Sequence, residues 1–165
     1  MASQMYPAPG FERKHCTPGE LAARVAALPR PLVFSNGCFD VLHRGHVTYL
    51  AQARALGAAL VIGVNSDASV RRLGKGAGRP VNAQDDRMAV LAALESVSLV
   101  VAFDQDTPLD LILLCHPDVL VKGGDWQPEN IVGSKEVLGW GGKVHSIPFL
   151  HQRSTTALLN KIRTL

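Results

Sequence analysis

The 165-residue sequence predicts an α/β fold in a single domain, built on a doubly wound parallel sheet. Apolar runs of strand length alternate along the chain with segments of helical spacing, a pattern typical of βαβ crossovers. The run 59–64 (ALVIGV) is unbroken, as expected of a strand covered on both faces. Hydrophobic residues make up 47% and charged residues 19%, which is the composition of a globular chain rather than a disordered one.

The first elements follow from local signals. Residues 1–16 are expected to form an irregular lead. Thr17, Pro18 and Glu20 then have the pattern of a capping box, with Thr17 as N-cap, and predict a helix over 18–28. The sequence therefore divides into a lead with a capped helix (1–30) and a main domain (31–165).

The main domain should open with a strand at 32–34 and a polar turn over 35–44. A helix is expected from Gly45, with Gly57 as its stop. Further strands are expected at 59–64, 98–103, 118–121 and 144–147. A short helical turn is expected after 65–67, and a helix is expected from Asn82 or Asp85 to near Glu95. Three more helices are expected, over 106–115, 129–138 and 154–163. Glycine-rich loops cover 73–82 and follow the strand at 118–121.

Composition also indicates the cellular compartment and excludes some classes of binding partner. The three cysteines are too few for a disulfide framework and have no CxxC spacing, so a reduced, cytoplasmic location is expected. The chain shows no signal peptide and no run of about 20 apolar residues, so no membrane partner is expected. The net charge of +3, without a basic face interleaved with aromatic residues, argues against nucleic acid. Arg71, Arg72, Lys75 and Arg79 form a basic cluster that could meet phosphate or be a solvated face.

The loop after the first predicted strand has the most informative chemistry, because ligands of an open parallel sheet bind beyond the carboxyl ends of the strands. Residues 35–46 read SNGCFDVLHRGH, with His43 and His46 at the start of a helix. A helix N-terminus and two imidazoles suit a phosphate, and Gly45 would let a nucleotide approach the backbone. A metal pair or surface histidines are the alternatives, but no third metal ligand has a fitting spacing.

Two other nucleotide-binding motifs are absent. The first strand–helix turn holds only Gly37 and Gly45, so it lacks the GxGxxG of dinucleotide-binding proteins, and no GxxxxGK[ST] occurs.

The segment SNGCFDVLHRGH resembles the first signature of the HxGH nucleotidyltransferases, the cytidylyltransferase-like superfamily. Further matching segments follow in order: 64–67 (VNSD), 70–73 (VRRL), 79–81 (RPV), 86–87 (DR), 117–125 (PDVLVKGGD) and 154–156 (STT). Together they resemble most closely the bacterial heptose 1-phosphate adenylyltransferases. The resemblance implies a Rossmann-like nucleotidyltransferase fold over 31–165.

The implied reaction is transfer of AMP from ATP to a heptose 1-phosphate, giving ADP-heptose for lipopolysaccharide inner-core synthesis and pyrophosphate. A sugar-phosphate oxygen would attack the α-phosphorus in line, without a covalent intermediate. The resemblance also implies Mg²⁺ held mainly by the triphosphate and waters, with no protein ligand, and a homo-oligomer. Since 165 residues leave no room for a fused kinase, a separate sugar kinase is expected to supply the substrate.

Site roles are carried over from the matching motifs. The residues expected to be catalytic are His43, His46 and Lys75. Those expected to bind the nucleotide are Asn36, Gly37, Phe39, Gly45, Arg87, Lys122, Gly124, Asp125, Ser154, Thr155 and Thr156. Those expected to bind the sugar substrate are Asp40, Asn65, Asp67 and Arg79. The sequence departs from the family's Leu-Lys-Gly by reading Leu73-Gly74-Lys75-Gly76, which leaves the exact role of Lys75 open.

Several simpler roles stay open. Asp40 could be a turn residue, Phe39 a core residue, Arg87 the partner of Asp86 in a surface ion pair, and 154–156 a plain helix cap. Two rival functions also remain. One is a cytidylyltransferase acting on a polyol phosphate such as glycerol 3-phosphate, and the other is a nucleotide-binding regulatory module without turnover.

Overall fold

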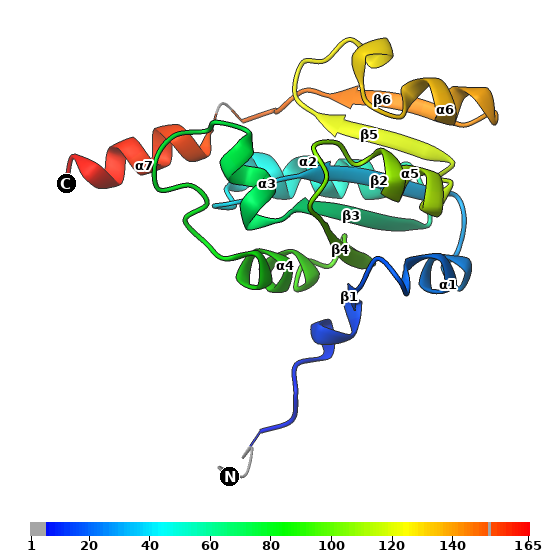
Figure 1. Ribbon diagram of the computed structural model, residues 1–165, viewed down its shortest axis with the longest axis horizontal. Coiled ribbons are helices and arrows are strands. Elements are labelled where there is room, and N and C mark those ends of the chain that lie inside the picture. Colours follow the sequence, from blue (N-terminus) through cyan, green and yellow to red (C-terminus); the bar gives the residue numbers. More distant parts are fainter. Residues whose placement is uncertain (1–5, 152) are drawn as a thin grey trace.

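A parallel sheet organises the computed structural model, which describes residues 6–151 and 153–165 (Figure 1). Six strands lie in the order β1-β4-β3-β2-β5-β6, and every neighbouring pair is parallel. The strands are β1 (His15–Cys16), β2 (Leu32–Gly37), β3 (Ala59–Asn65), β4 (Leu99–Phe103), β5 (Val119–Gly123) and β6 (Lys143–Ile147). The predicted α/β class and parallel sheet are confirmed.

Helices cover both faces of the sheet, as the doubly wound prediction requires. They are α1 (Leu21–Ala26), α2 (Arg44–Arg54), α3 (Asp67–Arg72), α4 (Gln84–Ala92), α5 (Leu109–Cys115), α6 (Ser134–Gly139) and α7 (Thr155–Arg163), with 3₁₀ turns η1 (Gly10–Lys14) and η2 (Pro128–Asn130). One apolar layer packs under α1, α5 and α6, around Leu21, Ile112 and Val137. The other packs under α2 and α4, around Leu50 and Leu91.

The lead is more ordered than predicted over residues 10–16, whereas residues 1–5 lie outside the described part of the chain. The segment 10–16 forms η1 and β1 instead of irregular structure, and β1 pairs with β4 at the sheet edge through His15↔Val100 and Cys16↔Val101. A two-residue strand has no periodicity of its own, so only its partner reveals it. Cys16 and Leu21 belong to the buried core, so the packing continues across the division at residue 30.

The capping box forms only in part. Helix α1 begins at Leu21, later than the predicted start at residue 18, and ends at Ala26. The Glu20 carboxylate accepts from the Thr17 amide at 2.9 Å and from the Thr17 hydroxyl at 2.8 Å. Because the hydroxyl donates to Glu20, it does not cap the helix.

Strand β2 runs to Gly37, three residues beyond the predicted end. Its register with β3 continues to Gly37↔Val64. Residues 35–37, which the sequence predicts as part of a turn, instead continue the strand, because Ser35 is fully buried and shares a hydrogen bond with the Tyr49 hydroxyl. The loop that precedes α2 therefore begins directly after Gly37.

The helix predicted over 129–138 is split into η2 and α6. Gly133 lies between them with φ 86°, and a Cβ there would come within 2.7 Å of the Ile112 side chain. This left-handed, tightly packed glycine interrupts the helix. The other predicted strands and helices are confirmed, with ends that move by a few residues.

Candidate active site

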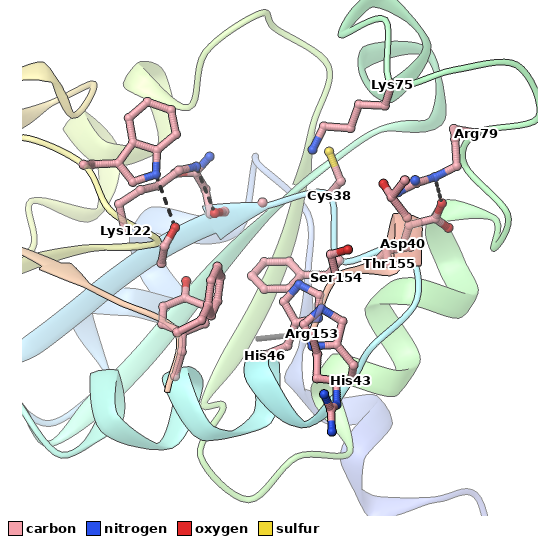
Figure 2. Close-up of a pocket in the computed structure, with 18 residues that line it drawn as sticks. Cys38, Asp40, His43, His46, Lys75, Arg79, Lys122, Arg153, Ser154 and Thr155 are labelled. Carbon is pink, nitrogen blue, oxygen red and sulfur yellow. Dashed lines mark hydrogen bonds and ion pairs between the residues drawn. The ribbon is translucent and has the colours of Figure 1, made fainter. Parts of the chain in front are cut away.

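A cavity of about 530 Å³ lies beyond the carboxyl ends of β2 and β5, where the prediction placed the chemistry (Figure 2). It brings together many of the predicted site residues from segments far apart in the sequence. These are Asn36, Gly37, Phe39, Asp40, His43, His46, Lys75, Arg79, Lys122, Ser154, Thr155 and Thr156. Their assigned roles stay predictions.

The two histidines form one unit at the start of α2. Their rings are stacked, with centroids 3.9 Å apart, and Phe39 meets His46 edge-on at 5.6 Å. His43 is the N-cap of α2, and its Nδ1 accepts from the Gly45 amide at 3.1 Å. Because Nδ1 accepts, the neutral ring carries its proton on Nε2, which is free to donate. A Cβ at Gly45 would lie 2.9 Å from the His43 ring, so glycine preserves this arrangement.

Burial keeps the histidines uncharged. It lowers the pKa of His43. For His46, burial followed by the nearby His43 and Lys75 lowers the pKa to about 4. The His46 Nδ1 is buried and has no hydrogen-bond partner within the described residues. At neutral pH the pair therefore offers uncharged N–H donors, and a bound polyanion would raise both pKa values.

Asp40 anchors the glycine-rich loop to the histidine loop. Its buried carboxylate accepts from the Val81 amide at 2.8 Å, the Asn82 amide at 2.9 Å and Nε of Arg79 at 2.5 Å. Burial alone would raise the pKa of Asp40, but the hydrogen bonds from Asn82, Val81 and Arg79 outweigh it and hold that pKa below its usual value. The carboxylate is thus engaged inside the protein, which favours an anchoring role over the predicted contact with sugar hydroxyls.

Arg87 lies beneath the same loops and outside the lining of the cavity. It is 1% exposed, and it donates to the Cys38 carbonyl at 2.6 Å, the Asn82 carbonyl at 3.0 Å and the Asp67 carboxylate at 2.8 Å. The ion pair is with Asp67, not with Asp86. This geometry favours positioning of the site loops over the predicted nucleotide contact of Arg87 and the predicted substrate contact of Asp67.

Lysines reach the cavity from two other elements. Nζ of Lys122, at the end of β5, donates to the Asn36 carbonyl at 3.3 Å, and burial lowers the pKa of this lysine. Its Nζ lies 6.0 Å from the centroid of the Trp126 ring. Lys75 is exposed on the glycine-rich loop and points into the cavity (Figure 2).

The N-terminus of α7 closes the cavity on another side. Ser154 is the N-cap, and its hydroxyl accepts from the Ala157 amide at 3.0 Å. The Thr155 hydroxyl donates to the Val41 carbonyl at 3.0 Å, which fixes α7 to the histidine loop. Ser154 therefore caps the helix, as the simpler interpretation had it, and also lines the cavity.

A second cavity, of about 210 Å³, adjoins the first. The two share Asn36, Gly37, Cys38, Lys75, Lys122 and Trp126. The second is also lined by polar side chains of Asn65, Asp106, Thr107 and Asn130 beside apolar ones such as Phe103 and Ile131. Gly124 and Asp125 line neither of these two cavities and face a separate hollow near Ala157.

Several residues that line the main cavity are not among the predicted site residues. These are Cys38, Tyr49, Gly123, Trp126, Phe149 and Arg153. Phe149 and Arg153 lie between β6 and α7, so the rule for strand carboxyl ends could have found them. Tyr49 lies three residues after His46 on α2, which is the same helix face.

Residues 6–151 and 153–165 contain neither a cluster of metal-binding side chains nor a membrane-spanning helix. No three side chains of His, Cys, Asp or Glu gather closely enough there to hold a metal ion. None of the helices in that part of the chain has the length and apolar character needed to cross a membrane.

Comparison with known proteins identifies the family. The cytidylyltransferase-like family model matches residues 34–157. The chain is 57% identical to the D-beta-D-heptose 1-phosphate adenylyltransferase of Bordetella bronchiseptica over 93% of this chain and 96% of that one. It is 58% identical to the bifunctional protein HldE of Pseudomonas paraeruginosa over 80% of this chain, and it spans only 28% of that relative.

Solved structures agree on the fold. A lipopolysaccharide core biosynthesis protein from Thermoplasma volcanium aligns with a TM-score of 0.60 at 24% identity, over 74% of this chain and 98% of that one. A pantoate–beta-alanine ligase from Francisella tularensis aligns with a TM-score of 0.59 at 13% identity, over 89% of this chain and 76% of that one. With the family model covering residues 34–157, the chain belongs to the cytidylyltransferase-like family.

Proposed function

We propose that this protein transfers AMP from ATP to a heptose 1-phosphate, producing ADP-heptose and pyrophosphate. The observation that carries the proposal is the stacked His43–His46 pair, which shares one cavity with the N-terminus of α7 and with lysines from two further elements. The 57% identity to a named heptose 1-phosphate adenylyltransferase, over nearly the whole of both chains, supports this choice of substrates.

The reaction needs charge stabilisation more than proton transfer. An oxygen of the sugar phosphate attacks the α-phosphorus, and the bond from that phosphorus to the bridging β-oxygen breaks. The electron pair leaves with pyrophosphate. The Nε2–H of His43, the His46 ring, Lys75 and Lys122 would stabilise the oxygens that gain charge, and the fixed loops would align the two substrates.

The two adjoining cavities suggest where each substrate binds. The larger holds most of the cationic side chains and suits the triphosphate. The smaller offers amide and hydroxyl groups beside apolar side chains, which suits a sugar. Lys75 and Lys122 line both, so the sugar phosphate and the α-phosphate would meet beside them.

Magnesium would be held mainly by the triphosphate and water. Asp40 is the one carboxylate that lines the main cavity among the described residues. Its oxygens already accept from Arg79, Val81 and Asn82, so it is poorly suited to a metal. Oxygen ligands from phosphate and water satisfy Mg²⁺. A cytoplasmic location, a homo-oligomer and a separate kinase that supplies the sugar 1-phosphate stay predictions.

The direct test combines each nucleoside triphosphate with candidate sugar and polyol phosphates and measures pyrophosphate release. We expect turnover with ATP and heptose 1-phosphate. Turnover only with CTP and glycerol 3-phosphate would favour the cytidylyltransferase. Nucleotide binding without any release of pyrophosphate would favour the regulatory module.

A further inference from the structure

An outer cavity, of about 280 Å³, lies between α7 and the glycine-rich loop that follows α3. Helix α7 extends away from the sheet beside this loop (Figure 1). Three cationic side chains line the cavity, Lys75 and Arg79 from the loop and Arg163 from the last turn of α7. The reaction proposed above gives Arg163 no role.

Two of the three positive charges of this cavity have no ion-pair partner among the described residues. Its lining contains no carboxylate, and its neutral polar side chains are Thr156 and Asn160. Arg79 is paired with Asp40, but within residues 6–151 and 153–165 neither Lys75 nor Arg163 forms an ion pair. Two unpaired cations with hydroxyl and amide donors suit a small anion that carries several charges and many acceptor oxygens.

The outer cavity adjoins the main one. Lys75, Arg79 and Thr156 line both. Arg163 lies nine residues after Ser154 along α7, which corresponds to about 13 Å at the rise of an α-helix. The cavity thus leads from the phosphate-binding end of α7 toward its far end, away from the histidines.

We propose that the outer cavity is a release site for inorganic pyrophosphate, with Arg163 as its outermost cation. This inference rests on the proposed function, in which the leaving group is pyrophosphate. After the bond to the α-phosphorus breaks, pyrophosphate passes from Lys75 to Arg163 and leaves at the far end of α7. The exposed cations also attract pyrophosphate from solution, so the same site sets product inhibition.

The test compares Arg163→Gln with Lys161→Gln in the full chain. Both substitutions remove one positive charge from the last turn of α7, but Lys161 does not line the outer cavity. Titration calorimetry measures the affinity for inorganic pyrophosphate, and steady-state kinetics measure its inhibition constant and the KM for ATP. We expect Arg163→Gln to weaken pyrophosphate binding about fivefold, as for one exposed ionic contact, and Lys161→Gln to change it less than about twofold.

The inhibition constant for pyrophosphate should rise more than the KM for ATP in Arg163→Gln. Equal increases would place Arg163 against the bound triphosphate and overturn the release site. An unchanged affinity, or the same loss in both variants, would overturn it as well. Because calorimetry needs no turnover, a protein that binds pyrophosphate through Arg163 but transfers no AMP would support the anion site and contradict the proposed function.

Discussion

Nε of Arg79 donates to the buried carboxylate of Asp40 at 2.5 Å, so one ion pair joins the glycine-rich loop to the histidine loop. The Asp40 side chain is fully buried, and that of Arg79 is only 10% exposed. Arg87 lies under the same junction and donates to Cys38 and Asn82. The groups of both loops that we propose to bind phosphate are therefore held in fixed positions relative to one another by side chains that need not touch a substrate.

Asp40→Asn should loosen the glycine-rich loop. The amide cannot balance the Arg79 charge, and removing one partner of a buried pair costs about 3 kcal/mol or more of unfolding free energy. Urea unfolding measures this loss. The rate of trypsin cleavage after Lys75 reports the mobility of the loop, and it should increase. Asp85→Asn, on the exposed start of α4, is the matched control. Equal cleavage rates in both variants would contradict the anchoring role.

His46→Ala should lower kcat by roughly 10²-fold or more, the usual cost of losing one group that stabilises charge in the transition state. Pyrophosphate release measures the rate, and calorimetry checks that ATP still binds. His145→Ala, on β6 and outside the main cavity, should keep full turnover. Undiminished turnover in His46→Ala would remove this residue from the mechanism.

Gly45→Ala should separate activity from stability. The new Cβ would lie 2.9 Å from the His43 ring, which must swing away and give up the hydrogen bond from the Gly45 amide. Alanine in place of a helical glycine adds about 0.5–1 kcal/mol, which offsets much of the lost cap, so stability should change little while kcat falls at least about tenfold. Gly139→Ala on α6, where a Cβ meets nothing within 4 Å, should leave kcat unchanged. A fully active Gly45→Ala would show that the His43 position is not critical.

The free protein should lose stability as the pH falls below about 6.5. The unfolded chain protonates His46 near its ordinary pKa of 6.5, whereas the folded protein keeps it neutral down to about 4. Protons therefore favour the unfolded state between these values, at a cost of about 3 kcal/mol once the pH reaches 4. Urea unfolding across this range should show a shallower loss in His46→Gln. Identical slopes in the two proteins would contradict the low pKa.

The sequence predicted the class of the fold and the location of the site, because both depend on local patterns. Runs such as 59–64 identify buried strands, and the order of strand and helix fixes which loops meet. The pairing of β1 with β4 was missed because two residues carry no pattern. The matching motifs predicted Asp40 and Arg87 as ligand-binding residues. Only the fold shows that their side chains form hydrogen bonds with neighbouring loops. Long-range hydrogen bonds of this kind leave no periodic signal.

The short strand β1 has one further consequence, for aggregation. It pairs with Val100 and Val101 of β4, whose sequence LVVAF is apolar, rich in β-branched residues and uncharged. Such a segment at an open sheet edge readily pairs with another chain. A chain shortened to residues 31–165 would keep every residue of the main cavity and yet expose this edge. We expect light scattering to show that the shortened chain self-associates, because β1 no longer covers the edge of β4.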